Sequence, residues 1–405
     1  MFEKRSVRTI VLLWLAWAVI LIGFQQVVTA RFSLQRPDHT LSWTANETTA
    51  FSNNDQPYLM EPFLNTQVAW DSEFYLSIAS VGYDDPDVRT TNANDPSAPS
   101  LNYAFMPLYP LFMRGVMAVL GVFGLNRIAT AALAGVIVSL IGTLAAMLGI
   151  YSLSRGKWGE DGGVRAAFYL LIFPSGFILA QVYTEGLFLG VVFLSLAFLY
   201  QRNWIPAGLL AAASLWIRPG EGLLLVLPFL YIWIKERCWQ KGWLKAIVSG
   251  LAVLAPTLSY FAWTCTDLAR KFWQVEDTFF SRGILKVANS LNQWGMGFNA
   301  LFGDNPQAAV FFAIEFLTVL LAIICIIKTW KEQPELALFS LGVLLLTYTS
   351  GVAQGMVRYL LAAPSIFFVL AGWGRKPAFD RAWSTASTLL MAMLTILFTF
   401  DFWVS

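Results

Sequence analysis

The sequence predicts an all-α polytopic membrane protein of about eleven transmembrane helices, with all 405 residues in a single transmembrane domain. Composition is the first reason, because 57% of the residues are hydrophobic and 13% are charged, roughly half the charged share of soluble domains. The second reason is that apolar runs of about the length that spans a bilayer recur along the chain. The third is that basic residues concentrate in alternate short links, as expected for cytoplasmic loops.

The first apolar run, 9–30, follows the basic residues Lys4, Arg5 and Arg8. It is about twenty residues long, longer than the apolar core of a signal peptide, so we expect a retained helix. The polar segment 31–127 is predicted to form a first outer loop with interfacial helices, and 264–307 a second outer loop. The other predicted spans are 128–151, 164–181, 184–200, 204–217, 219–234, 243–263, 308–328, 335–352, 356–373 and 385–403.

Topology depends on whether the aromatic stretch 105–123 crosses the membrane. If it lies in the outer interface, more than half of the 27 basic residues fall in short cytoplasmic links, whereas a crossing would reverse the bias. We therefore predict an interfacial stretch, a cytoplasmic N-terminus and an outer C-terminus. The spans 204–217 and 219–234 are short and meet at Arg218, which suggests a cavity open to the outside; tilt or local thinning is the alternative.

Few kinds of catalytic chemistry are open to this chain. Its three cysteines lack metal-ligand spacing, and its single histidine, His39, lies in a polar loop, so a zinc site or a histidine-dependent triad is disfavoured. No Gly-rich phosphate loop indicates a soluble nucleotide, and a net charge of +2 indicates no nucleic acid. An acidic stretch could hold a divalent cation, but a solvated loop explains it better: Asp84, Asp85, Asp87 and Asp95.

Four ionisable residues lie at the predicted outer ends of helices. Asp71 opens a short amphipathic helix and Glu185 opens a span, so either carboxylate could simply cap a helix. Arg218 and Arg358 could simply extend to the interface. Two arginines facing the same leaflet as two carboxylates nevertheless favour an anion clamp with an acid/base partner. Glu315, inside the span 308–328, is left without a role.

An ordered set of motifs between about residues 66 and 373 resembles the PIG-V family, the glycosylphosphatidylinositol mannosyltransferases of the second step and their prokaryotic relatives, within the GT-C glycosyltransferase superfamily. The chain departs from that family at Met106 and Gly186, and 264–307 shows no match. In chain order, the motifs contain Trp70-Asp71, Gly82-Tyr83, Tyr103-Ala104-Phe105-Met106-Pro107, Phe173-Pro174-Ser175, Tyr183-Thr184-Glu185, Arg218-Pro219-Gly220 and Met356-Val357-Arg358-Tyr359.

The resemblance implies a GT-C-type fold and transfer of a sugar, expected to be mannose, from a polyprenyl- or dolichyl-phosphate donor on the non-cytoplasmic face. The acceptor would be a lipid or glycan, and the membrane the plasma membrane of a prokaryote or the endoplasmic reticulum of a eukaryote. Asp71 is the expected catalytic base in a single inverting displacement. No metal ligand is assigned, although Mg²⁺ or Mn²⁺ dependence stays open. The expected substrate-binding residues are Glu73, Tyr183, Glu185, Arg218 and Arg358.

The main alternative function is a lipid or solute transporter or flippase. Such proteins usually show internal repeats and helices broken near the midplane of the membrane. This sequence shows no convincing repeat, and its unusual polar residues lie at the outer ends of the predicted spans. A transferase is therefore the preferred interpretation.

Overall fold

The computed structural model describes residues 3–33, 37–44, 64–95 and 97–404, so part of the predicted first outer loop (45–63) lies outside the described residues. The described chain is helical, with an isolated β-bridge between Thr90 and Ser100. The α-helices are α1 (Lys4–Arg31), α3 (Asp71–Ser80), α4 (Leu108–Leu120), α5 (Arg127–Leu171), α6 (Glu185–Tyr200), α7 (Trp204–Ser214), α8 (Pro219–Leu223), α9 (Val226–Lys235), α10 (Trp243–Thr264), α11 (Asp267–Thr278), α12 (Val287–Ala300), α13 (Pro306–Trp330), α14 (Pro334–Tyr348), α15 (Met356–Tyr359), α16 (Pro364–Trp373) and α17 (Pro377–Thr399). Short 3₁₀ turns supplement them, including η6 (Gly176–Ala180).

Five helices of the described chain, α1, α5, α10, α13 and α17, are long and apolar enough to cross a membrane. A sixth crossing results if Met356–Ala362 and Pro364–Trp373, which are bent by 84° at their junction, count as one span. These helices confirm a multi-pass membrane protein. Several other predicted spans are apolar helices of 10–17 residues, so the number eleven and the orientation in the membrane stay predictions.

Helix α5 combines two of the predicted spans. Gly159 has non-helical backbone angles (φ 74°, ψ −179°), and the position of Gly163 against Tyr151 shows that the chain reverses there. Residues 128–151 and 164–171 therefore form the two arms of a hairpin. The second arm ends at Leu171 rather than at the predicted residue 181, because the chain turns before Pro174, and the residue preceding a proline disfavours helical angles.

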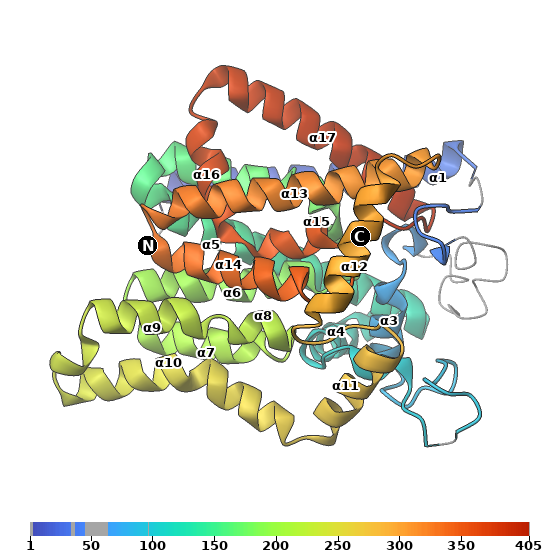
Figure 1. Cartoon of the computed structure of the whole chain (residues 1–405), viewed down its shortest axis with the longest axis horizontal. Coiled ribbons are helices and arrows are strands. Elements are labelled where there is room, and N and C mark those ends of the chain that lie inside the picture. Colours follow the sequence, from blue (N-terminus) through green and yellow to red (C-terminus); the bar gives the residue numbers. More distant parts are fainter. Residues whose placement is uncertain (1–2, 34–36, 45–63, 96, 405) are drawn as a thin grey trace.

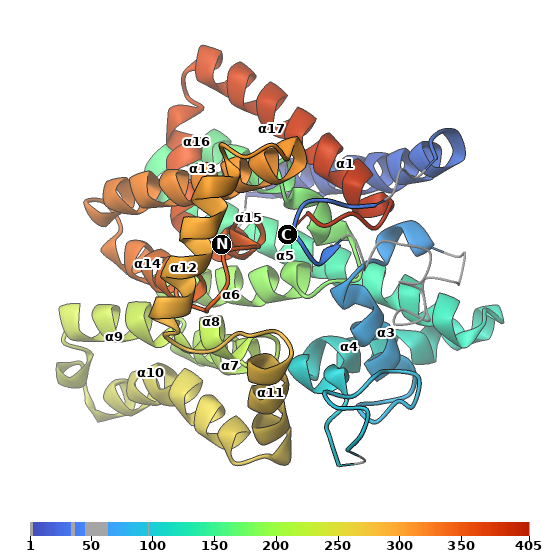
Figure 2. The same ribbon diagram turned by 45° about the vertical axis from the view of Figure 1, so that its right-hand side comes forward.

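The middle of the molecule is occupied by α5 and α6, and the long helices α1, α10 and α17 lie at its edge (Figure 2). In α5, 61% of the apolar 18-residue stretch that could cross a membrane is buried, against 28% of the corresponding stretch in α10. The outer surface of α10 carries a row of exposed apolar side chains: Leu244, Ile247, Leu251, Leu254, Leu258 and Phe261. Such a continuous apolar surface fits contact with lipid.

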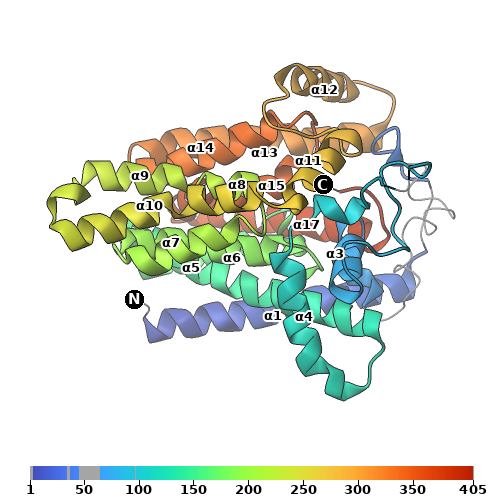
Figure 3. The same cartoon turned by 90° about the horizontal axis from the view of Figure 1, so that it is seen from below.

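The elements expected on the outer side gather at one end of the molecule. Figure 1 shows α3, α4 and α11 at the end opposite the N-terminus, and Figure 3 shows α4 crossing the long helices at a steep angle. Helix α4 has 13 residues, too few to cross a bilayer, and Leu111, Phe112 and Val119 on it are exposed. The interfacial position of 105–123 stays a prediction.

Candidate active site

Four predicted site residues form one charged network at the end of the molecule where α3 lies. The guanidinium of Arg358 donates from Nη2 to Oδ2 of Asp71 at 2.7 Å, and from Nε to Oε1 of Glu185. Arg218 donates from Nη2 to that same oxygen of Glu185. The side chain of Glu185 is 1% exposed and those of the two arginines 10% or less, whereas Asp71 is 23% exposed. The two buried arginines therefore share the buried carboxylate of Glu185, and Arg358 also contacts the accessible carboxylate of Asp71.

This network borders a large cavity of about 1140 Å³. Asp71, Arg218 and Arg358 line the cavity, whereas Tyr183 and Glu185 are not in its wall. Further lining residues with charged or aromatic side chains include Arg89, Glu221, Glu276, Arg282, Tyr359 and Trp403. The cavity thus presents carboxylates and guanidinium groups to the same space.

Asp71 is the first residue of α3, and its side chain pairs with Arg358 rather than capping the helix. The preceding Trp70 has backbone angles of φ 55° and ψ −117°, which are unfavourable for a residue with a side chain and persist only where the surroundings hold them. Tyr183 supplies part of that support, because its hydroxyl donates to the carbonyl oxygen of Ala69 at 3.0 Å. Tyr183 therefore positions the Asp71 backbone from behind the cavity wall.

Glu315, which the sequence left without a role, fixes the turn that carries Arg358. Its carboxylate accepts hydrogen bonds from the backbone N–H of Gly355 at 2.8 Å and of Val357 at 3.2 Å. Gly355 has φ 80°, an angle that glycine adopts without steric cost. Ser175, in the Phe-Pro-Ser motif, donates from its hydroxyl to the carbonyl oxygen of Val357. Two separate elements thus hold the backbone segment that leads into Arg358.

Glu185 is placed by the close packing of α6 on α5. A Cβ at Gly186 would collide with the carbonyl oxygen of Ser139 and would also contact the Thr143 hydroxyl. Only glycine fits there. Small residues allow membrane helices to approach closely in this way.

The second outer segment contributes two residues that the sequence analysis missed, Glu276 and Arg282. Burial raises the pKa of Glu276 to about 7; the charge of Arg282 opposes this rise, while Asp71 and Glu221 add to it. Arg282 donates to the hydroxyl of Tyr359, and its guanidinium lies 5.3 Å from the centre of that ring. One available signal is that Glu276 follows Phe272, which is buried on α11, by four residues, so a carboxylate lies on the apolar face of that helix.

Glu73 differs from the other predicted site residues. It is in the first turn of α3 but is 4% exposed and is not in the wall of the large cavity. We therefore propose a structural role for Glu73 instead of contact with a substrate.

Comparison with known proteins identifies no family. No family model and no curated protein matches the sequence. Among solved structures, ArnT from Cupriavidus metallidurans bound to undecaprenyl phosphate is 12% identical, with a TM-score of 0.49, over 95% of this chain and 76% of that one. The Archaeoglobus fulgidus oligosaccharyltransferase in its apo form is 13% identical, with a TM-score of 0.45, over 98% of this chain and 56% of that one. This chain thus spans just over half the length of the oligosaccharyltransferase, and similarity at this level establishes no shared activity.

The described residues contain no group of three or more His, Cys, Asp or Glu side chains placed to hold a metal ion. In the acidic stretch, Asp85 accepts from the hydroxyl of Ser77 at 2.7 Å, and Asp84 accepts from that of Tyr103 at 2.9 Å. These carboxylates are engaged in the packing of the loop.

Proposed function

We propose that this protein is a membrane glycosyltransferase that moves a sugar from a lipid-phosphate donor to an acceptor hydroxyl, with Asp71 as the general base. One observation carries the proposal. The carboxylate of Asp71 borders a cavity of about 1140 Å³ and is held 2.7 Å from Nη2 of Arg358, and Arg218 lines the same cavity. A carboxylate that could accept a proton thus lies beside groups suited to bind a phosphate, which supports the proposal.

In the proposed reaction, the acceptor hydroxyl attacks the anomeric carbon of the sugar and gives its proton to Asp71. The bond from that carbon to the phosphate oxygen breaks, and the phosphate leaves with the electron pair, so the anomeric configuration is inverted. Arg218 and Arg358 would bind the departing phosphate and stabilise its developing charge. Nε and Nη2 of Arg358 contact Glu185 and Asp71, which leaves Nη1 for a phosphate oxygen.

The finer assignments rest on the resemblance to the PIG-V family. We propose that the donor is a polyprenyl- or dolichyl-phosphate sugar, that the sugar is mannose, and that transfer occurs on the non-cytoplasmic face. Tyr183 and Glu185 take part by holding Asp71 and the arginines in place. The acceptor is proposed to be a lipid or glycan.

The test is transfer of radiolabelled mannose from polyprenyl-phosphate mannose to membrane acceptors, assayed with purified protein in vesicles with and without Mg²⁺. We expect Asp71→Asn to lower the rate by roughly 10²- to 10⁴-fold, the usual contribution of a positioned general base. Asp304→Asn, at an exposed position outside the cavity wall, is the matched control and should retain the wild-type rate. Undiminished transfer by Asp71→Asn would refute the assignment of the base. If folded wild type uses no lipid-linked sugar, the proposal fails and the transporter alternative gains support.

A further inference from the structure

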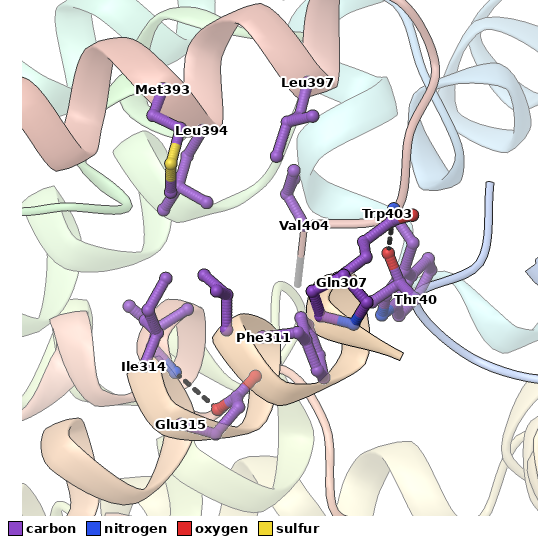
Figure 4. A pocket seen from close by; sticks show the side chains of 13 residues that line it. Thr40, Gln307, Phe311, Ile314, Glu315, Met393, Leu394, Leu397, Trp403 and Val404 are labelled. Atoms are coloured by element: carbon purple, nitrogen blue, oxygen red, sulfur yellow. Dashed lines mark hydrogen bonds between the residues drawn. The ribbon is translucent and has the colours of Figure 1, made fainter. Parts of the chain in front are cut away.

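A second, smaller cavity of about 320 Å³, called the groove below, lies between α13 and α17. Figure 4 shows apolar side chains of α17 facing those of α13 across this space. Both helices are long enough to cross a membrane, so the cavity lies between two candidate spans. The apolar lining comes mainly from Val310, Phe311, Ile314, Met393, Leu394 and Leu397.

The polar side chains in this lining are engaged with the protein. Gln307 donates to the carboxylate of Asp38 and to the hydroxyl of Thr40. Glu315 accepts the two backbone hydrogen bonds that fix the Arg358 turn. An occupant of the groove therefore gains little from polar groups, and an apolar space of this kind does not favour water.

The groove is accessible from the side that faces lipid. Val310 is 50% exposed and Met393 is 36% exposed, although both line the groove. Leu317, two residues beyond Glu315 on α13, is 64% exposed. A hydrocarbon chain in the surrounding bilayer could enter between the helices without passing through water.

One end of the groove adjoins the large cavity. Thr40 and Trp403 line both spaces, and Asp38 ties these two residues together by accepting from the backbone N–H of each, at 2.8 Å and 2.7 Å. Val357 also lines the groove, and the next residue is Arg358. A chain in the groove would therefore end close to the arginine that faces the large cavity.

We propose that the groove between α13 and α17 holds the hydrocarbon chain of the lipid-phosphate donor while its phosphate and sugar occupy the large cavity. The inference rests on the proposed function. In a polyprenyl phosphate the chain is attached directly to the phosphate, so the chain must leave the cavity close to the phosphate-binding arginine. Val357 places the groove at that point, which favours the donor over a lipid acceptor. Because lipid tails are as apolar as the groove, the groove acts mainly by orienting the donor.

Photo-crosslinking tests the placement without requiring transfer. An undecaprenyl phosphate with a diazirine on its chain is incorporated into vesicles with wild-type protein, and the labelled peptides are mapped. We expect labels in α13 around Ile314 and in α17 around Leu397, competed by unlabelled undecaprenyl phosphate. Labelling confined to other helices, or labelling of this groove by a lipid acceptor probe instead, would overturn the proposal. A segment of this chain filling the groove would also prevent labelling and overturn it.

A variant that fills the groove provides a second test of the proposal. Ile314→Trp should reduce kcat/KM for undecaprenyl-phosphate mannose by up to about 100-fold, as expected when a reacting group is misplaced, and should leave a methyl-phosphate mannose donor, which has no chain to place in the groove, unaffected. Leu317→Trp, on the exposed side of the same helix, is the matched control. Equal losses with both donors would refute the groove assignment. Absence of transfer by wild type from either donor would refute the proposed function, while the crosslinking result would still report on the groove.

Discussion

The carboxylate shared by Arg218 and Arg358 permits a quantitative test of the charged network. Glu185→Gln keeps the size of the side chain but removes the negative charge between two guanidinium groups that are 10% and 8% exposed. Removing one partner of a buried ion pair costs about 3–5 kcal/mol, because it leaves a buried charge uncompensated. Arg358 would keep Asp71, and Arg218 has Glu221 at 3.8 Å, so we expect a loss at the lower end, about 3 kcal/mol.

The matched control is Glu332→Gln. Glu332 pairs with Lys157 at 2.6 Å, but both side chains are more than 40% exposed, and exposed ion pairs contribute about 0–1 kcal/mol. The free energy of unfolding of each variant would be measured in mixed micelles by equilibrium denaturation followed by tryptophan fluorescence. Equal losses in the two variants would refute the argument that burial makes the Glu185 network important. The double variant Glu185→Gln/Arg218→Gln should lose less than the sum of its single changes, because it restores the charge balance.

Three further predictions concern the surroundings of the site. Because burial raises the pKa of Glu276 from 4.5 to about 7, the folded protein binds this proton more tightly than the unfolded chain. The stability that this proton contributes is present below about pH 4.5 and is lost as the pH rises to about 7. Thermal unfolding measured from about pH 5 to about pH 8 should therefore show the stability of Glu276→Gln rising relative to that of wild type, whereas the stability of Asp304→Asn relative to wild type should not change with pH. Glu315→Gln should cost about 1–3 kcal/mol, because each carboxylate oxygen accepts from a different backbone N–H and the amide NH2 that replaces one of them is a donor. Wild-type stability in denaturant would contradict this. Gly186→Ala should lose about 1–3 kcal/mol through collision with the α5 backbone, whereas Gly250→Ala, with open space around it, should be neutral or stabilising in the same assay.

The sequence predicted which residues are unusual better than it predicted how they meet. Glu185, Arg218 and Arg358 could be selected because ionisable groups at the ends of apolar runs are costly unless they have a function or a partner. Asp71 was selected through the resemblance to the PIG-V family. Their contacts could not be predicted, because hydrophobic periodicity defines the face of a helix but not the helix against which that face packs. The contact between Arg358 and Asp71, for example, joins residues 287 positions apart.

Other features were hidden because they depend on the backbone. Glu315 binds two backbone N–H groups, a partner that no residue type in the sequence reveals. The sequence predicted a non-helical link between the spans 128–151 and 164–181. In the structure the backbone stays helical almost up to the reversal at Gly159 on both sides. Glu276 was missed because its segment carries no motif, and its position on the apolar face of α11 gains meaning only once the opposite wall is known.

The two walls of the large cavity differ in how freely they can change during evolution. Asp71 and Arg358 are tied to tightly packed spans, where even one methyl group at Gly186 would disturb the α5–α6 contact. The opposite wall comes from α11 and the segment that follows it, where Ser281 and Leu285 have positive φ angles of 54° and few of the side chains are buried. Substitutions can accumulate on this second wall without displacing the proposed base. A family built on this plan could therefore exchange one acceptor for another while conserving its chemistry.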